Sequence, residues 1–347
     1  MPANDKVLNR RRGSPARVAL VTLGSLLALV VVVLLSLASG VEHVDLVRAF
    51  RDPSSADATI LFGTRVSRVL LGALVGMALA PAGVAFQALL RNPLADPYVL
   101  GVSGGAAVAG TIVIVLGGAA SVLGTWALPV WAFLGALISI ALVFLFGRVR
   151  GRLVPNVALL AGVVVNALSG ALIISVRMLS SPNAAHEALY WLTGTLLPVE
   201  GTRLWTLAAY VAVGLAVLFV SAVPMNAFAL GDEAAHAVGV NTDRARRTIF
   251  LAASLLTGAA VAFAGPIGFV GIVVPHVLRG LFGPDHRVLI PASALLGGAF
   301  VVAADAIARL SFLLLGSEPT VGVLTALCGA PFFLFVLRRR GAERGAL

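Results

Sequence analysis

The chain has 347 residues, of which 59% are hydrophobic and 12% are charged. A soluble domain carries about 25% charged residues, so this composition excludes a water-soluble globule and predicts an all-α polytopic membrane protein. The formal net charge is +10. That charge fits basic loops beside a membrane better than nucleic-acid binding, and no nucleic-acid partner is expected. Cys328 is the only cysteine, which excludes an internal disulfide and a cysteine-based metal site.

The apolar stretches are long enough to cross the ~30 Å hydrocarbon layer of a bilayer. Two of them are too long for one helix: residues 97–147, which Gly117-Gly118 interrupts, and residues 248–278, which Gly265-Pro266 interrupts. Dividing these two gives about ten membrane-spanning helices. They are expected at residues 18–39, 66–89, 97–116, 126–147, 154–176, 204–222, 247–264, 267–282, 289–314 and 320–337.

The distribution of basic residues predicts the side that each loop faces. With a cytoplasmic N-terminus, Lys6 and most arginines fall in cytoplasmic segments, as the positive-inside rule requires. Both termini are therefore expected in the cytoplasm, as tails 1–17 and 339–347 around a transmembrane domain 18–338. The apolar core of the first helix is about 20 residues long, whereas a secretory signal has 7–15, so this helix is expected to stay uncleaved.

Three arginines are expected near the outer side. Arg65 and Arg68 are three residues apart and share one helix face, and Arg309 follows Asp305 by four residues. These arginines are interpreted either as anchors at the membrane surface or as a docking site for an acidic outer partner. Asp305 is the only carboxylate inside an expected span, where an acid is a functional hypothesis by default. Its spacing from Arg309 favours a structural ion pair over a proton relay.

Residues 91–97, RNPLADP, lie at the inner turn between the second and third spans. Two prolines four residues apart forbid a continuing helix. The segment is either an ordinary helical turn or an irregular stretch that lines the inner mouth of a pathway, because irregular backbone at membrane depth needs a cover of protein or water.

Residues 101–105, GVSGG, fit the G-x-S-x-G pattern of a nucleophilic serine, and His276 lies in another span. An intramembrane serine protease is therefore a remote alternative. The pattern is weak because the chain contains 37 glycines, and Ser103 falls toward the inner half of its helix.

Residues 223–247 form the largest cytoplasmic excursion, and within it Ala229–Val238 can form a short helix. Gly231 breaks the start of this helix, and Gly239 suits its C-terminal stop. The segment is either a connector or a lever that docks on a cytoplasmic partner, and the presence of a helix favours the lever.

A weak internal repeat supports the interpretation of the chain as a transporter. Residues 76–83, GMALAPAG, and residues 258–265, GAAVAFAG, share a pattern of glycine and alanine. Five spans separate the two copies, so they would cross the bilayer in opposite directions, as in the inverted repeats of transporters. Chance similarity between small-residue segments is the alternative.

The source of energy must lie outside this chain if transport is driven by ATP. No G-x-x-x-x-G-K-[ST] motif is present, and Lys6 is the only lysine, so a P-loop is impossible. Either a separate ATPase subunit or an ion gradient supplies the energy. The chain itself is not expected to be an enzyme.

Several motifs, in matching order over about residues 60–338, resemble the permease subunits of ABC importers for ferric siderophores, haem and cobalamin. They are RVSRVLLGALVG from Arg65, NPLADP from Asn92, LGVSGG from Leu100, GPIGFVG from Gly265, PHVLR from Pro275, DHR from Asp285, ADAIAR from Ala304 and EPTVG from Glu318.

This resemblance implies a cobalamin-permease-like fold and a homodimer, or a pair with a paralogous permease, around a central pathway in the bacterial cytoplasmic membrane. It further implies two cytoplasmic ABC ATPase subunits, which bind ATP and Mg²⁺, and an extracytoplasmic substrate-binding protein. No cofactor and no metal bound by this chain are expected. The cargo would be a metal chelate, with a ferric siderophore as the first expectation and haem or cobalamin as alternatives.

The resemblance also assigns roles to residues. Arg65, Arg68 and Arg309 would meet acidic residues of the binding protein. Asn92 and Leu94 match positions that narrow the inner gate of the cobalamin permease. The second narrowing of that gate corresponds here to Pro155 and Asn156 in place of small hydroxyl residues, which argues against the same gate and against cobalamin. The residues expected to contact the ATPase are Leu230, Gly231, Asp232, Glu233, Ala234, His236 and Gly239.

A secondary carrier driven by an ion gradient is the rival class. It predicts transport without an ATPase and a requirement for Asp305.

Overall fold

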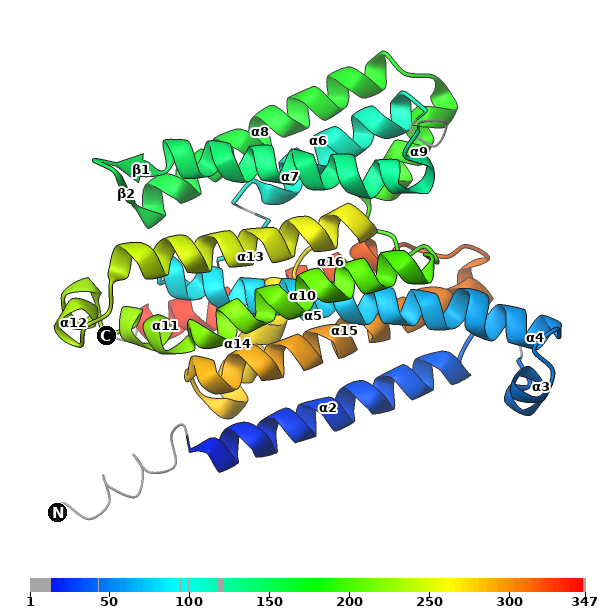
Figure 1. Cartoon of the computed structure of the whole chain (residues 1–347), viewed down its shortest axis with the longest axis horizontal. Helices are drawn as coiled ribbons and strands as arrows, with labels where there is room; N and C mark the ends of the chain where they lie inside the picture. Colours follow the sequence, from blue (N-terminus) through cyan, green and yellow to red (C-terminus); the bar gives the residue numbers. More distant parts are fainter. Residues whose placement is uncertain (1–13, 43, 94, 99, 118–121, 346–347) are drawn as a thin grey trace.

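The computed structural model describes residues 14–42, 44–93, 95–98, 100–117 and 122–345, and nearly all of them are helical. The helices lie side by side along one axis (Figure 1). α3 and α4 lie at one end of the bundle, called here the α3 end, and α12 lies at the opposite end, called the α12 end. The start of α2 and the end of α16 both lie at the α12 end.

The ten expected spans are present in the described part of the chain as seven long and three shorter apolar helices. The long ones are α2 (Pro15–Ala38), α5 (Val66–Leu89), α7 (Ala127–Phe146), α8 (Pro155–Met178), α10 (Gly201–Val220), α13 (Thr242–Ala264) and α15 (His286–Leu315). The shorter ones are α6 (Val102–Val115), α14 (Val270–Phe282) and the apolar part of α16 (Val321–Gly345).

Short elements that the sequence analysis did not separate lie at the two ends. At the α3 end these are α3 (Leu46–Arg51), α4 (Ala56–Ala58), the π-helix η1 (Thr59–Arg65), the 3-10 helix η3 (Gly124–Trp126) and α9 (Pro182–Leu192). At the α12 end these are the antiparallel strands β1 (Arg148–Val149) and β2 (Arg152–Leu153), together with α11 (Ala222–Phe228) and α12 (Asp232–Ala237).

α5 is the centre of the fold. Together with α4 and η1 it forms a continuous helical run, Ala56–Leu89, whose most apolar window is 83% buried, whereas that of α2 is 17% buried. α15, α13, α14 and α10 all pack against it. The run has 34 residues, which is about 51 Å at 1.5 Å per residue, so it reaches beyond the hydrocarbon layer at one or both ends.

Glycines allow the central helices to touch through their backbones. A Cβ at Gly76 would collide with the carbonyl oxygen of Gly297 in α15, and a Cβ at Gly83 would collide with that of Gly271 in α14. In lipid there is little hydrophobic drive between helices, so such close packing holds them together. Gly76 and Gly83 therefore serve close packing in α5.

The two copies of the sequence repeat lie in neighbouring helices that run in opposite directions. Residues 76–83 belong to α5, which starts at the α3 end, and residues 258–265 lie in α13 and just past its end, where α13 has crossed from the α12 end (Figure 1).

Three helix breaks meet within the bundle and form what we call the hub. α13 ends at Gly265, whose φ is +67°, and α14 starts only at Val270 rather than at the expected residue 267. The irregular segment 194–200 lies across this break, where Thr195 N donates to Ala264 O at 2.8 Å. The start of α16 joins them, because Gly322 N donates to Gly194 O at 3.1 Å.

Candidate functional site: two charged clusters at opposite ends

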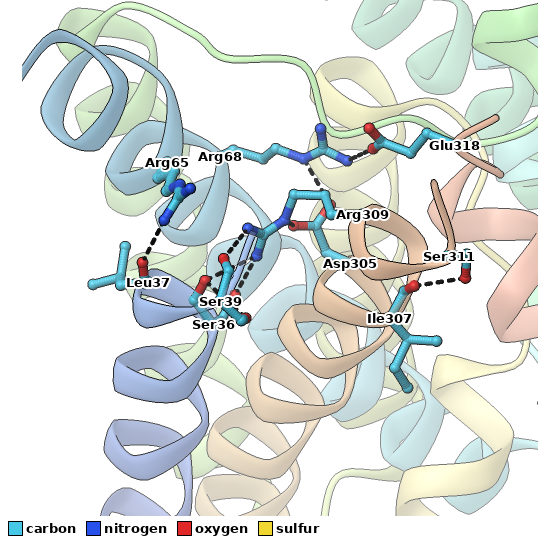
Figure 2. A network of polar contacts seen from close by, with 10 residues as sticks. All are labelled: Ser36, Leu37, Ser39, Arg65, Arg68, Asp305, Ile307, Arg309, Ser311 and Glu318. Atoms are coloured by element: carbon cyan, nitrogen blue, oxygen red, sulfur yellow. Dashed lines mark hydrogen bonds and ion pairs between the residues drawn. The ribbon is translucent and has the colours of Figure 1, made fainter. Parts of the chain in front are cut away.

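The first charged cluster lies at the α3 end, where α2, α5 and α15 converge (Figure 2). We call Arg65, Arg68, Asp305, Arg309 and Glu318 the arginine cluster. Arg65 is the last residue of η1 and Arg68 lies in the first turn of α5, while Asp305 and Arg309 lie on successive turns of α15. Glu318 lies in the connection between α15 and α16.

Arg65 and Arg309 bind the C-terminal end of α2. Arg65 donates to the carbonyl oxygens of Leu37, at 3.1 Å, and Glu42. Arg309 donates to Ser39 O at 2.9 Å; the Ser36 carbonyl and hydroxyl oxygens accept from it at 3.1 Å and 2.7 Å. The last carbonyl groups of a helix lack partners within that helix, and cations are favoured there. These two arginines therefore cap α2.

Asp305 lies between two arginines. Arg309 Nε donates to its Oδ2 at 3.0 Å, which is the ion pair expected from the spacing of the two residues, and Arg68 Nε donates to its Oδ1 at 2.7 Å. The Asp305 side chain is 1% exposed, so its charge is compensated inside the protein. Arg68 also pairs through Nη2 with Glu318.

The three arginines expected to dock a partner differ in their exposure. Arg65 and Arg309 are each 8% exposed, and their guanidinium groups face acceptors within this chain. The Arg68 side chain is 19% exposed, and that of its partner Glu318 is 34% exposed. The sequence analysis quoted Glu318 within a motif but gave it no role.

The second charged cluster lies at the α12 end and consists of Arg91, Asp232 and Arg246. Asp232, the first residue of α12, pairs with Arg91 beyond the end of α5 and with Arg246 of α13 at 2.5 Å. Arg246 also lies over the ring of Phe228 in α11, 5.5 Å from its centroid. Burial alone would raise the pKa of Asp232, but the hydrogen bonds and charges of the two arginines outweigh it and lower that pKa.

The other residues expected to contact an ATPase form an exposed surface around α12. Gly231, with φ +105°, precedes the helix, and Gly239, with φ +82°, follows it, as expected from the sequence. Leu230 is 73% exposed, and Glu233 and His236 are exposed as well. Ala234 is half-buried.

The described residues of the segment 91–97 are irregular, and they are tied to the break between α13 and α14. Asp96 is buried, and its carboxylate accepts hydrogen bonds from the backbone N–H groups of Tyr98, at 2.8 Å, and Phe269. Gln87 of α5 donates to Gly271 O at 2.9 Å. Burial raises the pKa of Asp96 to about 6, although both hydrogen bonds oppose the rise. The expected third span begins only at Val102, because this loop continues through Gly101.

The four gate positions have different surroundings. Asn92 and Asn156 are exposed, and Leu94 lies outside the described residues. Pro155 is the first residue of α8 and lines a void of about 10 Å³ with Leu89 and Leu90. Such a void holds at most about one water molecule, so among the described residues this void beside Pro155 is too small for a cargo.

The structure argues against the serine protease alternative. Ser103 Oγ is buried and has no hydrogen-bond partner within the described part of the chain. The ring of His276 packs edge-on against Phe332, with centroids 5.6 Å apart. A nucleophilic serine needs a base within hydrogen-bond reach, and Ser103 has none.

A groove of about 840 Å³ lies between α6, α7 and α8. Leucine, isoleucine, valine and small residues line most of it, and none of the described residues that line it is charged. The groove follows α8, the helix that begins with the gate positions Pro155 and Asn156.

The described part of the chain thus combines ten apolar helices, as expected of a polytopic membrane protein, with a charged cluster at each end. The chain belongs to the FecCD transport family, which matches residues 26–339. Its relatives include proteins named as permease proteins of ABC transporters and of import systems.

Three relatives illustrate the range of the family. The chain is 46% identical to a cobalamin import system permease protein of Halobacterium salinarum over 82% of this chain and 74% of that protein. It is 37% identical to a hemin transport system permease protein of Yersinia pestis, covering 93% and 96%. It is 33% identical to an iron(3+)-hydroxamate import system permease protein of Bacillus subtilis, covering 90% and 95%.

The fold also matches a solved structure described as an inward-facing conformation of a metal-chelate type ABC transporter. The TM-score is 0.79 at 28% sequence identity, covering 92% of this chain and 99% of that one. The expected family and fold class are thereby confirmed.

Proposed function

We propose that this chain is the membrane-spanning subunit of an ATP-driven importer for a metal enclosed in an organic chelator. The observation that carries this proposal is the family match along residues 26–339, together with a charged cluster at each end of one buried helix, α5. Relatives named for cobalamin, hemin and iron hydroxamate have in common a metal held inside an organic ligand. The metal then stays in its chelator during passage, and the chain needs no metal ligands of its own.

The α12 end is the cytoplasmic end in this proposal. Basic residues gather there, and the positive-inside rule places such loops in the cytoplasm. Both termini are then cytoplasmic, and the α3 end faces outward across the cytoplasmic membrane of a bacterium. The arginines at the α12 end include Arg148, Arg150, Arg152, Arg244, Arg246, Arg247, Arg279 and Arg287.

The exposed surface around α12 is the docking site for a separate ABC ATPase subunit, which binds ATP and Mg²⁺. Asp232 fastens α12 to α13 through Arg246 and to the end of α5 through Arg91. A movement of α12 that follows closure of the ATPase dimer therefore pulls on two transmembrane helices. Two copies of the ATPase would act on a pair of permease chains.

The pathway lies between two copies of this chain, or between this chain and a paralogue. The exposed face of α8, with Asn156 at its α12 end, and the exposed Asn92 would narrow the cytoplasmic mouth. An apolar wall without charges offers a bulky chelate no deep binding well, so the chelate can slide. A substrate-binding protein would deliver it to the α3 end.

The test is uptake of labelled cargo by cells that lack this gene, compared with cells in which the intact gene is restored. Three labelled cargoes are tested in parallel: a ferric siderophore, hemin and cobalamin. The sequence departure at Pro155 and Asn156 favours the siderophore, whereas the 46% identical relative favours cobalamin. The cargo is identified if its uptake is lost without the gene and restored with it. Equal uptake of all three cargoes by the two kinds of cell contradicts the proposal.

A second measurement separates this function from an ion-coupled carrier. Uptake is measured with Asp305→Asn, after ATP depletion and after collapse of the proton gradient. Asp305 is held by two arginines. We therefore expect uptake to be lost on ATP depletion, and we expect Asp305→Asn to lower uptake only because it destabilises the protein. ATP-independent uptake that is abolished by Asp305→Asn would establish the carrier instead.

A further inference from the structure

Arg68 is bound on its two sides by carboxylates in very different surroundings. Its Nε donates to Asp305, whose side chain is 1% exposed, and its Nη2 pairs with Glu318, whose side chain is 34% exposed. Figure 2 shows the Arg68 guanidinium group between the two acids, with Glu318 reaching it from the connection between α15 and α16. One guanidinium group thus has one buried partner and one partly exposed partner.

The two ion pairs differ in how easily they can be exchanged. Breaking a buried pair leaves an uncompensated charge in the interior and is strongly unfavourable. A partly exposed pair contributes little, because water and salt compete with it. A carboxylate that arrives from outside can therefore replace Glu318 on Arg68 but cannot replace Asp305.

The neighbouring arginines are not available for such an exchange. Arg65 and Arg309 are 8% exposed, and they hold carbonyl oxygens at the end of α2 and, for Arg309, Asp305. Taking either one away from its acceptors would uncap α2. Within the arginine cluster, this leaves the outer side of Arg68 as the place where a partner's acid can bind.

We propose that Glu318 is an internal competitor that occupies, on Arg68, the position taken by an acidic side chain of the docking partner at the α3 end. This inference rests on the proposed function, which supplies an outer binding protein. The release of Glu318 would free only the first part of the connection between α15 and α16. Its far end stays fixed, because Thr320 Oγ1 donates to Thr193 O at 3.2 Å and Gly322 N to Gly194 O at 3.1 Å.

The experiment uses the full chain in lipid nanodiscs and phenylglyoxal, a reagent that modifies accessible guanidinium groups. The rate of modification at Arg65, Arg68 and Arg309 is measured by mass spectrometry in the native protein and in Glu318→Gln. We expect Arg68 to react about twofold to fivefold faster in the variant, the range that a partly exposed ion pair supports. Arg65 and Arg309 should stay unreactive in both proteins.

Hexaglutamate, an acidic peptide, serves as the probe for the exchange. It should protect Arg68 from phenylglyoxal at low salt, lose this effect at high salt, and protect at a lower peptide concentration in Glu318→Gln than in the native protein. Glu42→Gln is the matched control, since it removes one negative charge at the same end, close to Arg65, from a residue that forms no ion pair with Arg68 within the described part of the chain.

An unchanged rate at Arg68 in Glu318→Gln overturns the proposal, as does an equal rise in Glu42→Gln. Protection of Arg68 at the same peptide concentration in the native protein and Glu318→Gln also overturns it, because Glu318 would then not compete. Neither measurement involves uptake. A failure of the importer proposal therefore leaves these results intact, and failure here leaves the uptake experiment intact.

Discussion

Arg309 makes contacts at three sites at once: the Asp305 carboxylate, the Ser36 hydroxyl and carbonyl, and the Ser39 carbonyl. A neutral amide cannot replace this set of charged hydrogen bonds. The consequence of its loss is partly limited, because Asp305 keeps Arg68 as a partner. A single buried arginine thus joins α15 to the end of α2.

Arg309→Gln is expected to destabilise the protein by about 3 kcal/mol, the lower end of the range for breaking a buried ion pair. The measurement is thermal unfolding of the detergent-solubilised protein. Arg48→Gln is the control, because the Arg48 side chain is 66% exposed and lies 3.8 Å from Asp57, so its change is expected to stay below about 1 kcal/mol. Equal effects of the two substitutions would contradict the capping role.

The raised pKa of Asp96 predicts a specific dependence of stability on pH. The folded protein binds a proton at Asp96 below about pH 6, whereas the unfolded chain does so only near pH 3.8. Between these values the folded state is favoured more as the pH falls, by about 3 kcal/mol over the whole interval. Asp96→Asn should remove this contribution.

The measurement for Asp96 is the unfolding midpoint at pH 7.5 and pH 5 in the native protein and in Asp96→Asn. The native protein should gain stability relative to the variant at pH 5. Parallel midpoints in the two proteins would show that Asp96 does not titrate in this interval.

Among the elements, the junction between the π-helix η1 and α5 carries both Arg65 and Arg68. Arg65 closes η1 and reaches α2, whereas Arg68 in α5 reaches α15 and Glu318. Two residues three positions apart therefore serve different neighbours.

The contact between α5 and α14 predicts that even a methyl group is too large at Gly83. Gly83→Ala would push against the carbonyl oxygen of Gly271, and forcing extra carbon atoms into a packed core costs about 1–3 kcal/mol. Gly24→Ala in α2 is the matched substitution, since nothing lies within 4 Å of a Cβ there. It should be neutral or stabilising, and thermal unfolding of both variants measures the difference.

α12 is short, and Asp232 fastens it to the bundle. Asp232→Asn should let the backbone amides of α12 exchange with deuterium severalfold faster while α13 stays protected, because two arginine contacts lose their charge. Glu233→Gln is the control, since Glu233 is exposed and makes no ion pair within the described residues. An equal rise of the exchange rate in both variants would show that the loss of a negative charge, and not the loss of the arginine contacts, causes the effect.

At the scale of the whole molecule, hydropathy and the glycine–proline breaks were enough to predict the ten spans and the division near Gly265. The Asp305–Arg309 pair followed from helical spacing. Contacts between residues far apart in sequence could not be predicted in this way, because no periodicity links Arg68 to Asp305 or Arg91 to Asp232. The burial of Arg65 and Arg309 was missed for the same reason, since it depends on the end of α2.

The orientation of the bundle can be tested on the whole chain. Ala56→Cys at the α3 end and Ala237→Cys at the α12 end are both exposed positions, and each is placed in a Cys328→Ser background. A membrane-impermeant thiol reagent added to spheroplasts should label Ala56→Cys directly and Ala237→Cys only after permeabilisation. The reverse pattern would invert the proposed orientation.

The hub can be completed only late in the synthesis of the chain. Its backbone hydrogen bonds join Gly194 and Thr195 to Ala264 and Gly322, so the set is incomplete until residue 322 has left the ribosome. Until then the carbonyl oxygen of Gly194 lacks its hydrogen bond from Gly322 N, and a backbone polar group without a partner is costly wherever water is absent. A chain that stops before α16 therefore leaves the hub open, although the segments that carry its other members have already been made.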